Sequence, residues 1–264
     1  MDSASTNYRL TLKNVIFSEW IKLTSTPSAW FTLLGVIGAM TAFGTVAAFG
    51  GSIPGSTFLS SESDPVYRVL IGSRGSILML GILGVMIGAR EYSSGLIQTT
   101  FAATPSRLPV FAGQIAAALT AILPTATLAS FLAFAVGMAA MASAGNPTVA
   151  LSDAGALRAV LGSVAYLTGA GIFGIGLGNL LRSPISGTAL IFGGFVAAPG
   201  LATSLLPSSW TWVLAYLPSE AGASLTALTP TANLLSVETG ALVFLAWVVL
   251  AVVAGGVSML RRDV

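Results

Sequence analysis

Six stretches of this chain carry almost no charge and are long enough to cross a lipid bilayer. A membrane-spanning helix needs about 20 apolar residues, because about 30 Å of hydrocarbon is crossed at about 1.5 Å per residue. The stretches between charged residues predict six spans, near residues 28–49, 69–89, 109–141, 159–181, 185–206 and 239–260. The second reaches this length only if it begins near Val69 and Arg74 extends outward to the interface.

The composition favours a membrane protein over a soluble helical bundle. Charged residues make up 8% of the 264 residues, against about 25% in ordinary soluble domains, and hydrophobic residues make up 55%. Helices of a soluble bundle show a charged outer face, and the six stretches have none. We therefore expect an all-α membrane protein that forms a single transmembrane domain over residues 1–264.

The residue types that the chain lacks exclude several chemistries. It has no cysteine and no histidine, so disulfides, thiol nucleophiles, zinc sites with nitrogen or sulfur ligands and Ser-His-Asp triads are excluded. Its two lysines, Lys13 and Lys22, do not follow the glycine frame of a P-loop. We expect no catalytic, cofactor-binding or metal-binding residues in this chain, and no enzymatic activity of its own. A net charge of +2 gives no reason to expect nucleic-acid binding.

The distribution of basic residues predicts the orientation in the membrane. With six spans both termini lie on one side, which then holds the basic residues at positions 9, 13, 22, 90, 107, 182, 261 and 262. The other side holds Arg68, Arg74 and Arg158. The side richer in Lys and Arg is the cytoplasmic one. We expect a multi-pass protein of the plasma membrane with a cytoplasmic N-terminus and a cytoplasmic C-terminus.

Residues 8–24 have the pattern of an amphipathic helix that lies in the membrane interface. At 100° per residue, one arc is apolar and includes Trp20, while Glu19 and Lys22 fall on the opposite arc. The alternative is a simple extension of the first span. Thr26-Pro27 argues against a continuous helix, because the residue before proline prefers extended geometry.

Two segments between the spans stand out. Residues 90–107 form a polar cytoplasmic segment, which is either a solvated loop or a docking element for a cytoplasmic partner. Residues 207–238 form a longer outer segment with aromatic residues spaced for the interface and a turn at Leu-Pro-Ser-Glu (217–220). A short re-entrant or surface helix is expected there.

Small and polar residues inside the spans predict helix contacts. Gly169 to Gly174 reads G-x-G-x-x-G, but no strand precedes it, so helix packing is favoured over dinucleotide binding. The same packing role is predicted for four glycines at four-residue spacing: Gly84, Gly88, Gly174 and Gly178. Gln114 and Asn179 either form a hydrogen bond between helices or line a polar pathway.

Several segments together resemble a known family. They are Ser-Glu-Trp-Ile-Lys-Leu (18–23), Ser-Ala-Trp (28–30), Gly-Ala-Arg-Glu-Tyr-Ser-Ser-Gly-Leu-Ile-Gln-Thr-Thr (88–100), Ala-Thr-Pro-Ser-Arg (103–107), Leu-Pro-Ser-Glu-Ala-Gly (217–222) and Arg-Arg-Asp (261–263). With these segments the chain resembles the six-span permease subunits of ABC transporters, in the type 2 exporter class, especially the short actinobacterial ones. The resemblance covers essentially the whole chain, and the Glu-Tyr-x-x-Gly segment is its most specific part.

The resemblance implies a division of labour between subunits. Residues 8–24 would be the connecting helix, and residues 90–107 would hold the coupling helix that contacts a cytoplasmic ATPase. The coupling residues implied in this way are Arg90, Glu91, Tyr92, Gly95, Thr104, Pro105 and Arg107. Two permease chains, identical or related, would associate with two ATPase subunits that bind ATP and Mg²⁺. The expected activity is export of an amphiphile such as a drug, a lipid or a peptide antibiotic.

Other functions remain compatible with the residues. The chain could serve as a membrane anchor or immunity component that binds a ligand or a partner without moving it. An intramembrane enzyme is disfavoured, because the spans hold no histidine, no cysteine and no central pair of acids.

Overall fold

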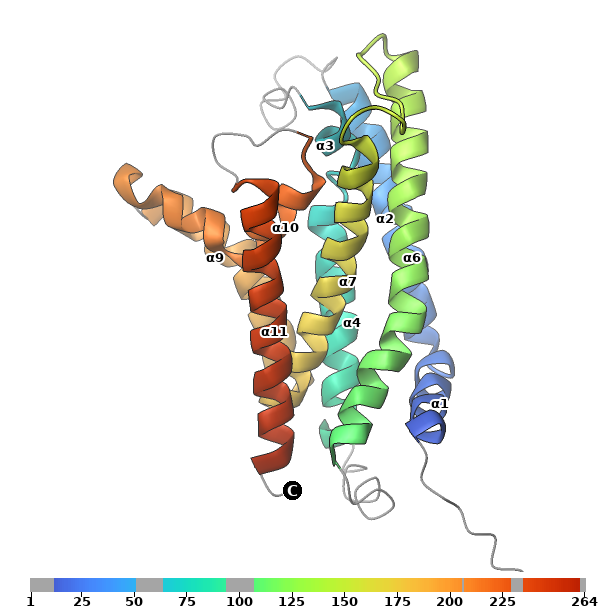
Figure 1. Cartoon of the computed structure of the whole chain (residues 1–264), viewed down its shortest axis with the longest axis vertical. Coiled ribbons are helices and arrows are strands. Elements are labelled where there is room, and N and C mark those ends of the chain that lie inside the picture. Colours follow the sequence, from blue (N-terminus) through green and yellow to red (C-terminus); the bar gives the residue numbers. More distant parts are fainter. Residues whose placement is uncertain (1–11, 51–63, 94–106, 206, 229–234, 262–264) are drawn as a thin grey trace, which may run out of the picture.

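The computed structural model describes residues 12–50, 64–93, 107–205, 207–228 and 235–261, and within these ranges every regular element is a helix (Figure 1). Five long helices each supply one candidate membrane span: α2 (Pro27–Gly50), α4 (Ser73–Ser93), α6 (Arg107–Ser143), α7 (Ala156–Leu181) and α11 (Val237–Arg261). The sixth candidate span, Pro184–Leu201, is built from consecutive shorter helices. The six apolar helices confirm the predicted fold class, a six-span all-helical membrane protein.

Shorter helices lie at the two ends of this bundle. Helix α1 (Leu12–Thr24) lies beside α6 at the end where α11 terminates, which we call the near end (Figure 1). At the opposite, far end lie α3 (Pro65–Val69) and α10 (Pro218–Ala223). Two 3₁₀ helices flank α10, η2 (Ser208–Tyr216) and η3 (Ser224–Thr226). Helical structure in the outer segment was predicted, and the structure confirms it.

Helix α7 is the centre of the bundle. In its span 78% of the residues are buried, and it packs against α4, α11 and α6, while α2 packs mainly on α6. The predicted glycines explain the tight contact between α4 and α7. A Cβ atom on Gly84 would collide with the carbonyl oxygen of Gly171, and one on Gly178 would lie 2.6 Å from that of Val85. Small residues therefore let the two backbones approach closely, as predicted for Gly84, Gly88, Gly174 and Gly178.

The second span differs from its predicted form. It does not begin near Val69, because α3 ends there and a turn over residues 70–72 separates α3 from α4. Gly72 in this turn lies against the backbone of α2, where an added Cβ would be 2.8 Å from the Cα of Met40. The chain thus packs sideways on α2 before α4 starts at Ser73.

The fifth span is broken rather than continuous. Helix α8 (Pro184–Phe192) is followed by a π-helical turn (Gly193–Ala197) and then by α9 (Ala198–Leu205), which extends away from the bundle (Figure 1). Pro199 has no N–H and cannot bond to the carbonyl four residues earlier. The N–H of Ala198 bonds instead to the carbonyl of Gly193, five residues earlier, which is the π-helical pattern.

Candidate functional site

The last turns of α4 form a junction between the helices of the near end. Helix α4 ends at Ser93, immediately before residues 94–106. Its two described polar side chains in this region, Arg90 and Tyr92, contact different neighbours. We call Arg90, Tyr92 and their partners the α4 junction.

Arg90 connects α4 to the link between α1 and α2. Its Nη1 donates to Thr26 Oγ1 at 2.6 Å and to the carbonyl oxygen of Lys22 at 3.2 Å. Thr26 Oγ1 in turn donates to the same Lys22 carbonyl at 2.8 Å. Thr26 stands before Pro27, where the sequence predicted a break between two helices, and the structure confirms that break. The guanidinium group of Arg90 therefore connects α4 to the segment where α1 ends and α2 begins.

Tyr92 connects α4 to α7 and α11 through a single arginine. The guanidinium carbon of Arg182 lies 4.8 Å from the centroid of the Tyr92 ring, within the range of a cation–π contact. Arg182 caps α7 in the left-handed conformation, at φ 55°, and its N–H bonds to the Gly178 carbonyl. Its Nη2 donates to the carbonyl oxygen of Ser258 in α11 at 3.1 Å. The helices α4, α7 and α11 are thereby joined at their near ends.

The remaining predicted coupling residues are only partly placed. Gly95, Thr104 and Pro105 lie outside the described residues. The backbones of Glu91 and Arg107 belong to the last turn of α4 and the first turn of α6, and their side chains also lie outside the description. Their coupling role stays a prediction.

Helix α1 has one side buried against the protein and one side exposed. Val15, Glu19 and Leu23 are buried, each at 7–8% exposure, whereas the apolar side chains of Phe17 and Ile21 are exposed. The reason is that α1 packs on α6, where Val15 lies beside Gly113. Buried Glu19 is neutralised by Lys22, whose Nζ lies 2.6 Å from its Oε1, and Trp20 packs partly buried against the core. Phe17 and Ile21 are left to face outward from the protein.

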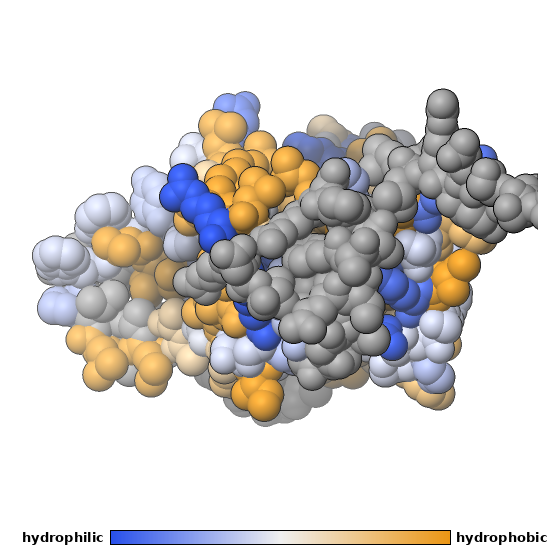
Figure 2. Space-filling model, turned by 90° about the horizontal axis from the view of Figure 1, so that it is seen from below, coloured by the Kyte–Doolittle hydropathy of each residue, from blue (hydrophilic) through white to orange (hydrophobic). Residues whose placement is uncertain are grey.

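A pocket of about 380 Å³ opens between α1, α2 and α4 at the near end. Its charged and hydroxyl lining is Glu19, Lys22, Thr26, Ser28, Thr32 and Arg90. Its apolar lining is Leu23, Ala29, Ile82, Leu83, Met86 and Ile87. Figure 2 shows this end of the protein, where strongly hydrophilic residues adjoin apolar surface.

The two predicted polar residues inside the spans meet each other. Asn179 Nδ2 in α7 donates to Gln114 Oε1 in α6 at 3.0 Å, and both residues are at most 1% exposed. Asn179 Nδ2 also donates to the Ile175 carbonyl. Gly88 of α4 lies next to the amide, since a Cβ there would be 2.8 Å from Nδ2. The hydrogen bond between helices is thus observed, and a role in a polar pathway stays a prediction.

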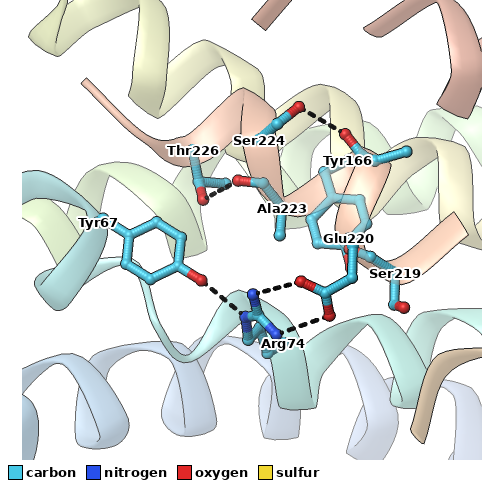
Figure 3. A network of polar contacts seen from close by, with 9 residues as sticks. Tyr67, Arg74, Tyr166, Ser219, Glu220, Ala223, Ser224 and Thr226 are labelled. Atoms are coloured by element: carbon cyan, nitrogen blue, oxygen red, sulfur yellow. Dashed lines mark hydrogen bonds and ion pairs between the residues drawn. The ribbon is translucent and has the colours of Figure 1, made fainter. Parts of the chain in front are cut away.

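A second polar cluster lies at the far end and was not predicted (Figure 3). Arg74 Nη1 and Nη2 donate to the two carboxylate oxygens of Glu220, each at 3.0 Å, and Arg74 Nε donates to the Tyr67 hydroxyl at 2.9 Å. The sequence predicts that Arg74 extends outward, and the structure pairs it with Glu220 on α10, with 38% of the Arg74 side chain exposed. Tyr166 of α7 donates to the Ser219 carbonyl at 2.9 Å, which holds the start of α10.

Helix α10 is inserted into the bundle rather than lying on its surface. Ser219, Ala221 and Gly222 are buried, and Tyr166 packs where Gly222 has no side chain. Tyr166 is ten residues beyond the start of α7, which is about 15 Å along that helix. The sequence signal for the start of α10 is Pro218, which suits the first turn of a helix.

Comparisons with known proteins leave the chain without an assigned family. No protein-family model matches it, and no curated protein matches it. The fold defines it as a multi-span helical membrane protein.

Proposed function

We propose that this chain is the permease subunit of an ATP-driven ABC exporter, and that a separate ATPase supplies the energy for moving an amphiphile. The observation that supports this most is the α4 junction. The segment expected to dock the ATPase, residues 90–107, begins in the last turn of α4, which has two anchors. Arg90 contacts the α1–α2 link, and Tyr92 contacts α7 and α11 through Arg182. A movement of this segment, driven by the ATPase, would therefore be transmitted to α1 and α2 through Arg90 and to α7 and α11 through Tyr92.

The charges support a cytoplasmic near end. Among the described residues, the near end carries Lys13, Lys22, Arg90, Arg182 and Arg261. The far end carries fewer, namely Arg68, Arg74 and Arg158. In the proposed orientation the near end faces the cytoplasm of the cell, where an ATPase with bound ATP and Mg²⁺ is available.

A second permease chain is part of the proposal, and the broken fifth span supports it. Only 17% of this span is buried within the chain. A Cβ atom added to Gly193, Gly194 or Gly200 would have no neighbouring atom within 4 Å. Glycines in membrane helices are enriched where another helix approaches closely. The partner would be a second copy of this chain or a related one.

The proposal is tested by co-purification and transport. The chain is expressed together with a candidate ABC ATPase, purified, and reconstituted in vesicles that are assayed for ATP-dependent movement of a panel of fluorescent amphiphiles. We expect a stable complex and transport that is lost on replacing Glu91 or Gly95. Lys13→Gln, a change of one exposed basic residue at the same end, is the control and should leave transport intact.

Two outcomes would contradict the proposal. Absence of any ATPase complex, or full transport after the Glu91 and Gly95 replacements, would remove the coupling role. A complex that binds amphiphiles without moving them would instead indicate an anchor or immunity component.

A further inference from the structure

The pocket between α1, α2 and α4 has separate polar and apolar parts. Its lining on α4 runs from Ile82 to Arg90, eight residues or about 12 Å along the helix axis. The end near Arg90 carries Lys22, Thr26 and Ser28, and the part near Ile82 is apolar apart from Thr32. A molecule that fills the whole pocket must therefore be polar at one end and apolar at the other.

The charge of the polar part favours an anion. Among the described lining residues, two cations, Lys22 and Arg90, accompany one carboxylate, Glu19, so these residues together carry a net positive charge. Glu19 is also the less accessible group: its side chain is 7% exposed, against 41% for that of Lys22. The charge that an entering molecule meets first is therefore positive, and hydroxyl groups of Thr26 and Ser28 stand beside it.

The position of the pocket relates it to the lipid surface. It lies at the first turn of α2 and the last turns of α4, where both candidate spans end. Trp30, half exposed, donates its indole N–H to the Thr24 carbonyl next to the pocket, and tryptophan is enriched at the level of the headgroups. In a bilayer crossed by these two spans, the lipid headgroups of one leaflet would therefore lie level with the charged rim.

We propose that this pocket binds one anionic phospholipid of that leaflet. Its phosphate group would lie between Lys22 and Arg90, and the beginning of an acyl chain would lie along Ile82, Met86 and Ile87. The lipid would bridge α1 to α4 beside the existing contact of Arg90 with Thr26. This inference does not rest on the proposed transport function, since neither an ATPase nor a substrate takes part in it.

The test measures lipid binding by the full chain alone. The protein purified in detergent is titrated with a fluorescent phosphatidylglycerol, and unlabelled phosphatidylglycerol or phosphatidylcholine with the same acyl chains serves as competitor. We expect phosphatidylglycerol to compete about tenfold better or more, because a charge-assisted contact is lost with the neutral headgroup. Equal competition by phosphatidylcholine would overturn the proposal.

Variants locate the site. Lys22→Gln and Arg90→Gln should each weaken binding about tenfold, whereas Lys13→Gln and Arg261→Gln, exposed basic residues of the same end outside the pocket, should not. Thr32→Trp keeps every charge and fills the apolar part of the pocket, so it should abolish binding. If Arg90→Gln fails to fold, Lys22→Gln and Thr32→Trp still test whether the lipid binds in this pocket. Unchanged binding by both variants would overturn the proposal.

A last comparison separates a lipid site from a phosphate site. Glycerol 3-phosphate carries the same phosphate chemistry without an acyl chain. We expect it not to compete at concentrations where phosphatidylglycerol does, because the apolar half of the pocket adds nothing to its binding. Equal competition by glycerol 3-phosphate would show an anion site and overturn the lipid assignment.

Discussion

Arg74 and Glu220 are 146 residues apart in sequence and form two parallel hydrogen bonds across the far end of the bundle. The pair links the first turn of α4 to α10. Glu220→Gln should lower the free energy of unfolding by about 1–2 kcal/mol, because it removes a charged acceptor while the partial exposure of Arg74 screens the remaining charge. Thermal unfolding of the purified protein in detergent measures this effect. Glu238→Gln, a change of an exposed acid in the first turn of α11, is the comparison and should cost less, because only its interaction with the helix dipole is lost.

The pair can also be tested for direct coupling. Arg74→Gln alone should destabilise the protein by a similar amount, and the double variant should cost less than the sum of the two single changes. Strictly additive effects would show that the two side chains do not act on each other.

The glycine contact between α4 and α7 gives a steric prediction. Gly84→Ala places a methyl group against the Gly171 carbonyl, which belongs to a backbone and cannot turn aside. The expected result is a clear loss of folded protein in size-exclusion chromatography. Gly38→Ala, in α2, meets no atom within 4 Å and should leave the elution profile unchanged or improve it. A folded, stable Gly84→Ala variant would contradict the close contact of the two helices.

The buried amide pair separates a structural role from a pathway role. Gln114→Leu removes the acceptor of Asn179 and should cost about 1 kcal/mol of stability. If the amide pair has only a structural role, the Gln114→Leu variant should transport as much substrate per folded molecule as the wild type. Thr127→Val, a change at a partly exposed position of the same helix, should alter neither quantity. Transport that falls while thermal unfolding is unchanged would instead favour a polar pathway through Gln114 and Asn179.

The α4 junction predicts that the Tyr92 ring matters. Tyr92→Leu removes the cation–π contact with Arg182, and Tyr92→Phe keeps an aromatic ring in place. If force passes through this contact, ATP-dependent transport by the reconstituted complex falls strongly in the leucine variant and less in the phenylalanine variant. Equal transport by both variants and the wild type would exclude Tyr92 from coupling.

Much of the fold follows from the sequence, because its signals are local. The spacing of charges is enough to find six spans, since the length of a span is set by the bilayer. The glycines at four-residue spacing identify the packing face of α4 and α7, because residues four apart lie on one side of a helix. Gln114 and Asn179 were recognised for a similar reason, as rare amides in apolar helices.

The features that sequence reasoning missed depend on contacts between distant segments. The pairing of Arg74 with Glu220 requires α10 to enter the bundle. No local sequence pattern predicts how deeply a short helix lies between longer ones. Glu19 looked like an outward-facing acid until Lys22 and the packing on α6 accounted for its burial. The break in the fifth span has a local signal, because Gly193 and Gly194 are followed five residues later by Pro199.

Because α6 is long, it extends further at the far end than the other helices of the bundle (Figure 1). Its 37 residues measure about 55 Å, well beyond the roughly 30 Å of hydrocarbon that a span must cross. Asn146, just after α6, donates its side-chain N–H to the carbonyl of Ala48, so the upper part of α2 is fastened to the same tall side (Figure 1). Within the described residues, α2 and α6 therefore project beyond α10, most of whose residues are buried between the longer helices (Figure 1).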